Sequence, residues 1–419
     1  MKKSLFAIAA VTAFAGAAQA QSSVTVYGIV DTGYAGGNAK SSSALGSTAG
    51  TFSMLQMSGG ESSNRLGFRG VEDLGSGLSA KFVLETSLQA NSDAWNPTWR
   101  QAWAGFAKKG LGEARIGTQN SLIWQLAAPM TVGQLNNFTG SVINATNFQS
   151  NSNAGSTAAT GVDGNVGFTN RTQRTLQLES ERMSGVQAKA MYVLNNANSN
   201  ETQTSANLST GSSTGGVNNF NGWGLSLDYT GVKNLRVAGA YQSFNADNPY
   251  TATQAAGVNT YTAGTPTVCP GNAQISTSSY TSVSTTCTNV RDNQYFIAAT
   301  YDFGILTAYA NYINRKATSQ VQPNVYVSRT AQELGVRSFI TPTIEGWASA
   351  GNVRYTSFGS GQPTANIVGY QVGANYWMSK RTNLYAIFGA TGTSNASNVA
   401  NSNDSANANN YGLGVRHTF

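Results

Sequence analysis

Of its 419 residues only 10% are charged, while 10% are aromatic and 46 are glycine. Soluble globular proteins carry roughly a quarter charged residues, so this composition is unusual for that class and suits a protein that contacts lipid. The formal net charge of +7 at pH 7 is a modest excess for this length. It does not by itself indicate a nucleic-acid partner.

The first twenty residues have the features of a cleaved secretory signal. Lys2 and Lys3 precede an apolar run, which ends in the small-x-small cleavage pattern Ala18-Gln19-Ala20. We expect residues 1 to 20 to be removed, so that residues 21 to 419 form the folded domain. A retained N-terminal anchor is the less favoured alternative, and no later window offers twenty apolar residues for a membrane-spanning helix.

Strand signals recur with a regular rhythm along the rest of the chain. About ten residues of alternating polar and apolar side chains are followed by a short turn, a second alternating run and a longer polar loop. The pattern predicts sixteen strands: Ser23 to Tyr34, Asn64 to Glu72, Leu78 to Leu88, Arg100 to Ala107, Glu113 to Gln119, Arg171 to Ser180, Val186 to Leu194, Gly222 to Tyr229, Leu235 to Phe244, Asp292 to Tyr301, Ile305 to Arg315, Ala331 to Ile340, Ile344 to Thr356, Asn366 to Trp377, Asn383 to Ala390 and Asn409 to Phe419.

The connections between these runs also alternate in length. Turns such as Asp73 to Gly77 and Lys108 to Gly112 are short, whereas the intervening loops are long and often rich in Asn, Ser and Gly. Short turns at one rim, long loops at the other and an even number of strands are typical of barrels in outer membranes.

Side chains of opposite character occupy the two faces of the predicted strands. In Asn366 to Trp377, one face carries Val368, Tyr370 and Val372, and the other carries polar residues such as Gln371. Lipid on one side and water on the other explain this split, because sixteen strands enclose an aqueous channel rather than a packed core. The predicted fold class is all-β, a 16-stranded antiparallel transmembrane β-barrel. A soluble multi-domain β protein is the alternative.

One interruption of the strand pattern, residues 119 to 170, has no two-residue alternation. A structureless insert of this length is improbable in a compact domain unless it is functional or disordered. Its first part is apolar, with Leu122, Ile123 and Leu126, and it needs a partner to pack against. We expect a loop that folds into the interior of the barrel, with the Asn/Ser/Gly-rich part from Asn144 to Gly161 as a flexible surface segment.

Four short motifs are spread from the first strand to the last residue: Val24 to Asp31, Asn64 to Gly70, Arg100 to Gly105 and Gly414 to Phe419. In combination they resemble the general diffusion porins of Gram-negative bacteria, especially the β-proteobacterial branch. The resemblance implies a homotrimer of sixteen-stranded barrels in the outer membrane, each with an inward third loop that narrows the pore. It also implies that Phe419 belongs to the signal read by the barrel assembly machinery.

In porins of this kind, arginines on the strand wall opposite the third loop form a ladder. The resemblance assigns this role to five residues: Arg65, Arg100, Arg171, Arg69 and Arg115. Alternation alone places Arg65 and Arg69 on the interior face of their strand. Arg100 shares a predicted face with Ala102 and Ala104, small residues that would leave room for the loop. Removing Arg100 is therefore expected to lower the anion preference more than removing any other single arginine.

Asp163 is the only acid in this loop, so the arginine ladder would face few carboxylates. An unbalanced ring of positive charge favours anions. The alternative is that interior arginines pair with Glu85, Glu179 or Asp31 on neighbouring strands. The sequence predicts a pore for passive diffusion of small hydrophilic solutes and ions, with a preference for anions.

Enzymatic activity is not expected, because the only histidine, His417, lies close to the chain end on the apolar face. Ser/His or Cys/His chemistry therefore lacks a base, and no nucleotide-binding or metal-ligand spacing occurs. No cofactor or metal is predicted. A substrate-specific outer-membrane channel for a small anionic or sugar solute remains the alternative function.

Cys269 and Cys287 lie in one long polar segment between two strands. In an exported chain, the expected state is a disulfide that closes a local loop and contributes roughly 3 kcal/mol, mostly to that loop. We therefore expect reduction, or replacement of both cysteines by serine, to leave conductance and the heat resistance of the oligomer almost unchanged. Bilayer recordings with and without reductant test this, and collapse of the barrel on reduction contradicts it.

Overall fold

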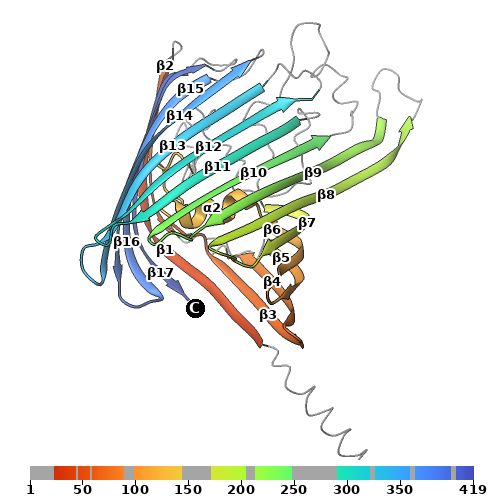
Figure 1. Cartoon of the computed structure of the whole chain (residues 1–419). Coiled ribbons are helices and arrows are strands. Elements are labelled where there is room, and N and C mark those ends of the chain that lie inside the picture. Colours follow the sequence, from red (N-terminus) through yellow and green to blue (C-terminus); the bar gives the residue numbers. More distant parts are fainter. Residues whose placement is uncertain are drawn as a thin grey trace, which may run out of the picture.

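The structure, a computed structural model, describes residues 23–43, 46–56, 59–88, 99–143, 171–203, 213–247, 290–320, 326–358, 364–397 and 403–419. These residues form one antiparallel sheet with a helix, α2 (Leu122–Met130), beside it (Figure 1). The strand segments are β1 (Ser23–Ser43), β2 (Gly46–Gln56), β3 (Arg65–Gly75), β4 (Leu78–Ser87), β5 (Trp99–Lys108), β6 (Gly112–Asn120), β7 (Arg171–Ser180), β8 (Val186–Gln203), β9 (Ser213–Tyr229), β10 (Leu235–Asp247), β11 (Val290–Asp302), β12 (Thr307–Ser319), β13 (Tyr326–Phe339), β14 (Ile344–Phe358), β15 (Thr364–Trp377), β16 (Thr382–Ser397) and β17 (Asn403–Thr418). Within the described ranges, no helix has the length and apolar character needed to cross a membrane.

Strand β1 closes the sheet into a barrel because it pairs along both of its edges. One edge pairs with β17, starting with Ile29 opposite Thr418. The other edge pairs first with β3 and then, from Gly33 opposite Gln56, with β2. Segments β2 and β3 therefore occupy one strand position, and the seventeen segments make a closed barrel of sixteen strands. The predicted fold class is confirmed.

Each predicted strand is present, but many extend further toward the long loops. Strand β8 continues nine residues beyond Leu194 to Gln203, and β9 begins at Ser213 rather than Gly222. Segment β2 was not predicted at all. These added residues are mostly Asn, Ser, Thr and Gly, which have low or moderate strand propensity. Pairing with a neighbouring strand holds them extended, and the local sequence does not reveal that pairing.

The two faces of the barrel wall differ as the alternation predicts. On β15, Val368 is 63% and Tyr370 is 49% exposed, whereas Gln371 between Tyr370 and Val372 is fully buried. The exposed apolar side chains cover the outer surface, where lipid replaces water as the solvent. The pattern fits a wall whose backbone hydrogen bonds are all made between strands.

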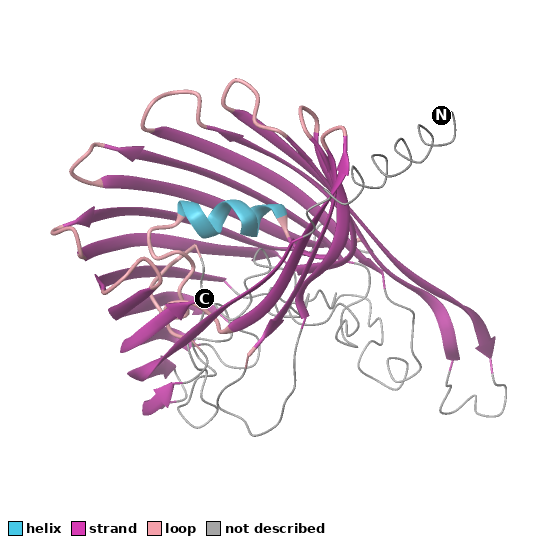
Figure 2. Cartoon of the chain, turned by 90° about the horizontal axis from the view of Figure 1, so that it is seen from below, coloured by secondary structure: helices cyan, strands magenta, loops and turns pink. Residues whose placement is uncertain are grey.

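The interior is less polar than the sequence analysis expects. Phe244, Phe296 and Ile313 on the inner wall are fully buried and form one cluster with Leu122 and Ile123 of α2. Figure 2 shows α2 lying within the curve of the sheet. The apolar face of a helix needs an apolar surface to exclude water. The prediction of a polar interior face is therefore wrong for the wall beneath the helix.

Candidate functional site

The segment that crosses the interior, residues 121–143, begins with helix α2. The hydroxyl of Ser121 caps the helix by accepting a hydrogen bond from the backbone N–H of Trp124 at 3.3 Å. The buried side chains follow helical spacing: Leu122, Ile123, Leu126, Ala127 and Met130. The sequence pattern predicts a loop here, and the helical spacing of these apolar residues is the signal for the helix that is present.

Hydrogen bonds attach this segment to strands that are far apart around the barrel. At its start, Ile123 N donates to Gln242 Oε1 of β10 at 3.4 Å. Toward its end, Thr139 N donates to Asn410 Oδ1 of β17 at 2.8 Å. Both acceptor side chains are buried on the inner face. Residues 121–143 therefore run along the inner wall from β10 to β17.

Glu333 of β13 holds the last part of the segment. The residue is 2% exposed, and its carboxylate accepts hydrogen bonds from Ser141 Oγ at 2.9 Å and from Val142 N at 2.8 Å. On the same strand, the guanidinium of Arg329 donates to the carbonyl oxygen of Val142. The buried side chains of Glu333 and Arg329 thus provide the hydrogen-bond partners of the backbone N–H and C=O of Val142.

The backbone of the segment touches the barrel wall where glycines leave space. A Cβ atom on Gly389 would lie 1.7 Å from Thr139 O, and one on Gly140 would lie 2.1 Å from Tyr370 O. Gly140 also has φ +115°, a conformation that other residues rarely adopt. The close approach therefore requires glycine at both positions.

A group of interior basic residues that the resemblance does not assign lies on the wall that carries the segment. Arg337 of β13 donates to the carbonyl oxygen of Val132, and its other amino group lies 3.2 Å from Glu345. Three more arginines belong to this group. Arg315 pairs with Asp292, Arg416 lies 3.5 Å from Glu61, and Arg329 is the residue described above that donates to Val142. Alternation with exposed Leu334 and Val336 could have placed Arg337 inside.

Arg65 and Arg69 of β3 keep positive charge available to the interior. Arg65 donates to two neutral groups, Ser63 O at 3.1 Å and Ser62 Oγ at 3.0 Å. Arg69 is exposed, and its guanidinium lies 5.5 Å from the centre of the Tyr27 ring. No carboxylate of the described residues lies within 4 Å of either guanidinium.

Arg100 is paired and buried. Its Nε lies 2.8 Å from Glu85 Oε1, and only 9% of the residue is exposed. Glu85 also accepts a hydrogen bond from the hydroxyl of Tyr27. This is the pairing that the sequence analysis left open as the alternative. It removes the reason to expect the largest effect on selectivity from Arg100.

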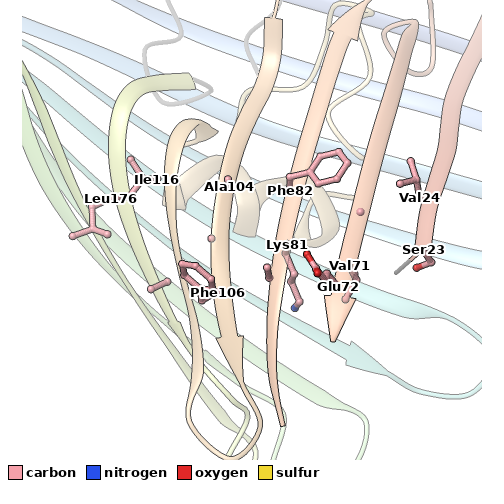
Figure 3. Close-up of a pocket in the computed structure, with 14 residues that line it drawn as sticks. Ser23, Val24, Val71, Glu72, Lys81, Phe82, Ala104, Phe106, Ile116 and Leu176 are labelled. Carbon is pink, nitrogen blue, oxygen red and sulfur yellow. The ribbon is translucent and has the colours of Figure 1, made fainter. Parts of the chain in front are cut away.

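The face assigned to β5 from alternation was wrong. Ala104 lines an apolar groove of about 510 Å³ on the outer side of the wall, and Ala102 shares its parity (Figure 3). Neither residue makes room for the interior segment. Arg100 still points inward because the register slips by one residue between Trp99 and Gln101. Such a bulge reverses the side on which the preceding residues project.

Arg115 of β6 is also neutralised by neighbouring acids. Its guanidinium lies 3.2 Å from Glu113 and 3.6 Å from Glu179, and it covers the ring of Trp103 at 4.9 Å. Glu179 in turn lies 3.1 Å from Lys189. Arg115 therefore belongs to a network of ion pairs and is not a free cation.

Arg171 of β7 lies against the interior segment. Its guanidinium is 4.1 Å from the centre of the Trp124 ring of α2. Arg174, three residues later, is exposed and bonds to Asn195 Oδ1 at 2.6 Å. The strand is irregular here, since Arg174 has φ +50°. The two arginines thus lie in different surroundings.

Phe419 lies at the seam where the barrel closes. Its backbone exchanges two hydrogen bonds with Gly28, at 3.1 and 3.2 Å, and its ring covers that glycine. The residue is 41% exposed on the outer face. Asp163, Cys269, Cys287 and the signal segment lie outside the described residues.

Comparison with known proteins finds relatives among bacterial outer-membrane proteins. An outer membrane porin protein of Bordetella pertussis is 39% identical over 137 residues, which cover 29% of this chain and 34% of that protein. Outer membrane porin protein 32 of Delftia acidovorans is 42% identical over 120 residues, which cover 28% and 31%. The aligned part thus spans about a third of the length of these relatives.

Solved structures share the fold over almost the whole chain. The anion-selective porin from Comamonas acidovorans has a TM-score of 0.60 at 18% identity, covering 95% of this chain and 100% of that one. The outer membrane channel DcaP of Acinetobacter baumannii has a TM-score of 0.56 at 10% identity, covering 95% and 97%. The family model described as Gram-negative porin matches residues 7–396, and the chain therefore belongs to the Gram-negative porin family.

Proposed function

We propose that the protein forms a water-filled channel for passive diffusion of small hydrophilic solutes across the outer membrane, with a preference for anions. One observation carries the proposal: Arg65 and Arg69 contact only neutral groups in the described part of the chain, and residues 121–143 contain no acid. The residues from Ser121 to Ile143 narrow the passage by occupying part of the interior. Solutes then pass between this segment and the part of the barrel wall that includes β3.

Three arginines supply the positive field in this proposal: Arg65, Arg69 and Arg171. Arg65 and Arg69 contact neutral hydroxyls, carbonyls or aromatic rings, and Arg171 lies against the ring of Trp124. Fixed charges of one sign in a narrow aqueous passage raise the local concentration of ions of the other sign. Arg100 and Arg115 contribute less, because carboxylates within hydrogen-bond or ion-pair distance cancel most of their field.

Replacing Arg69 with alanine is expected to lower the ratio of chloride to potassium permeability by roughly twofold, since one unit charge acts through water over a few ångströms. Arg65→Ala and Arg171→Ala should act in the same direction, and combined effects should overlap because the charges share one field. Reversal potentials in a salt gradient measure the change. The preference should also weaken in 1 M salt, where the Debye length is about 3 Å.

The matched control removes a basic group together with its acidic partner. The double variant Arg100→Gln, Glu85→Gln changes no net charge, so its reversal potential should equal that of the unmodified protein. Arg174→Ala, outside the interior, should also have no effect. A cation-preferring unmodified protein, or an equal effect of Arg174→Ala and Arg171→Ala, contradicts the charge assignment.

A channel specific for one small anionic or sugar solute is the second candidate. The observation that favours it is the stacking of arginine on indole, at 4.1 Å for Arg171 on Trp124 and 4.9 Å for Arg115 on Trp103. Aromatic faces beside guanidinium groups can bind a flat solute or a sugar. Conductance that saturates with one solute supports this candidate, and linear conductance with all solutes supports general diffusion.

We also propose that three barrels associate. One structural neighbour, OmpT of Vibrio cholerae, is described in a trimer form. In this chain the apolar groove lined by Val24 of β1, Phe82 of β4 and Phe106 of β5 lies on the outer face of the barrel wall (Figure 3). A groove of this kind fits a neighbouring barrel wall. Mass measurement in detergent tests the number of chains.

A further inference from the structure

The residues that lead into β3, residues 59–64, are mostly buried although they form no strand. We call them the strap. Gly59, Gly60 and Glu61 are all buried. Connecting segments usually run over a protein surface, because a buried backbone needs partners for its polar groups. The buried course of the strap therefore depends on hydrogen bonds to the groups around it.

Interior groups near the closing seam of the barrel fasten the strap to the wall. Asp31 Oδ2 of β1 accepts a hydrogen bond from Ser62 N at 2.7 Å. Glu61 Oε2 accepts a hydrogen bond from Asn383 Nδ2 of β16 at 2.9 Å and lies 3.5 Å from the guanidinium of Arg416 on β17. Side chains of β1, β16 and β17 therefore hold the strap in place.

The strap is also bonded to the interior segment, residues 121–143. Asn137 N donates a hydrogen bond to Gly60 O at 2.9 Å, and Asn137 Nδ2 donates to Gly59 O at 2.8 Å. The same amide donates to Ser63 Oγ at 3.3 Å. The strap therefore joins the wall at the seam to the segment that narrows the passage.

The strap holds the side chain of Arg65, the residue that follows it. Arg65 donates from Nε to Ser63 O at 3.1 Å and from Nη2 to Ser62 Oγ at 3.0 Å. Glu85 of β4 lies diagonally across from Arg65, because Ser87 is opposite Arg65 and Glu85 is two residues away on the same face. Long side chains at diagonal positions can meet. The strap thus keeps Arg65 on neutral acceptors although a carboxylate lies within reach.

We propose that the strap is a positioning element for ion selectivity, which keeps the guanidinium of Arg65 away from Glu85 and directed at anions in the passage. The inference rests on the proposed function, in which Arg65 contributes to the anion preference. A guanidinium that moves to a carboxylate, as Arg100 does on Glu85, acts less on passing ions. Release of the strap should therefore lower the anion preference without any change in the charge of the protein.

Two variants that change no charge release the strap in different ways. Gly59→Ala adds a Cβ atom that would lie 2.2 Å from Ser62 O, at a position with φ +91°. Asn137→Ala removes the amide that donates to Gly59 and Ser63. Each variant should lower the ratio of chloride to potassium permeability by up to about twofold, the change expected for Arg65→Ala. Reversal potentials in a salt gradient measure the ratio.

The control Gly75→Ala matches the backbone strain of Gly59→Ala. Gly75, at the end of β3, has φ +84° with nothing within 4 Å of a Cβ atom, so the ratio should not change. Adding either strap variant to Arg65→Ala separates an action through Arg65 from other effects on the passage. Without Arg65, release of the strap should cause no further fall in the ratio. Heat-dependent migration in gels shows which variants form a folded barrel.

A further fall in the ratio when a strap variant is added to Arg65→Ala overturns the inference, because the strap then acts on the passage without Arg65. The inference alone is rejected, and the proposed function stands, if Arg65→Ala lowers the ratio while Gly59→Ala and Asn137→Ala leave it unchanged. If Arg65→Ala itself has no effect, the charge assignment in the proposed function is wrong, and the inference is rejected with it.

Discussion

Replacing Glu333 with leucine is expected to release the end of the interior segment and to make the pore current noisy. The carboxylate accepts hydrogen bonds from Ser141 and Val142, so its removal leaves the buried N–H of Val142 without its acceptor. An unsatisfied group of this kind costs about 1–3 kcal/mol. The population with the segment displaced should therefore rise by about tenfold or more.

Single-channel recordings measure this change as a higher mean conductance with frequent transitions between levels. Asp292→Leu is the matched control, because among the described residues this buried acid bonds to Arg315 and Gln294 on the same wall and not to residues 121–143. Both variants destabilise the barrel, but only Glu333→Leu should alter the current levels. Quiet, unchanged channels from Glu333→Leu would show that other contacts hold the segment.

Gly389 gives an independent approach to the same question. A side chain there would overlap Thr139 O, so Gly389→Val should displace the segment without removing any charge. The expected result is the noisy current of Glu333→Leu with an unchanged reversal potential. Because Gly239 has no such close neighbour, its nearest contact being 3.6 Å, Gly239→Val should leave the current unchanged.

The barrel could be predicted from the sequence because lipid and strand geometry impose a simple rule. A wall with lipid outside needs apolar residues at every second position, and the run Val368, Tyr370, Val372 shows this directly. The number of strands followed from counting such runs. The polar strand extensions carry no such signal, because they lie beyond the lipid and any residue that can remain extended is accepted there.

The interior site was harder to predict because alternation fails at irregular points. The bulge beside Arg100 and the positive φ of Arg174 each shift the register, and no residue type announces them. The ion pair between Arg100 and Glu85 depends on that shift. The apolar inner wall around Phe244 and Phe296 was missed for another reason, because it makes sense only once a helix is known to cover it.

Deleting Phe419 is expected to reduce the amount of folded barrel in the outer membrane several-fold, while the pores that do form conduct normally. The residue supplies two backbone hydrogen bonds to Gly28 at the closing seam, and its exposed ring on the outer face cannot reach the interior. Each bond contributes only about 1 kcal/mol, so the larger effect should fall on assembly. Heat-dependent migration of membrane fractions measures folded barrel, and bilayer recordings measure the pore. Phe419→Ala keeps the backbone bonds, so an equal loss of yield would identify the ring as the assembly signal, whereas a normal yield after complete deletion would rule that role out.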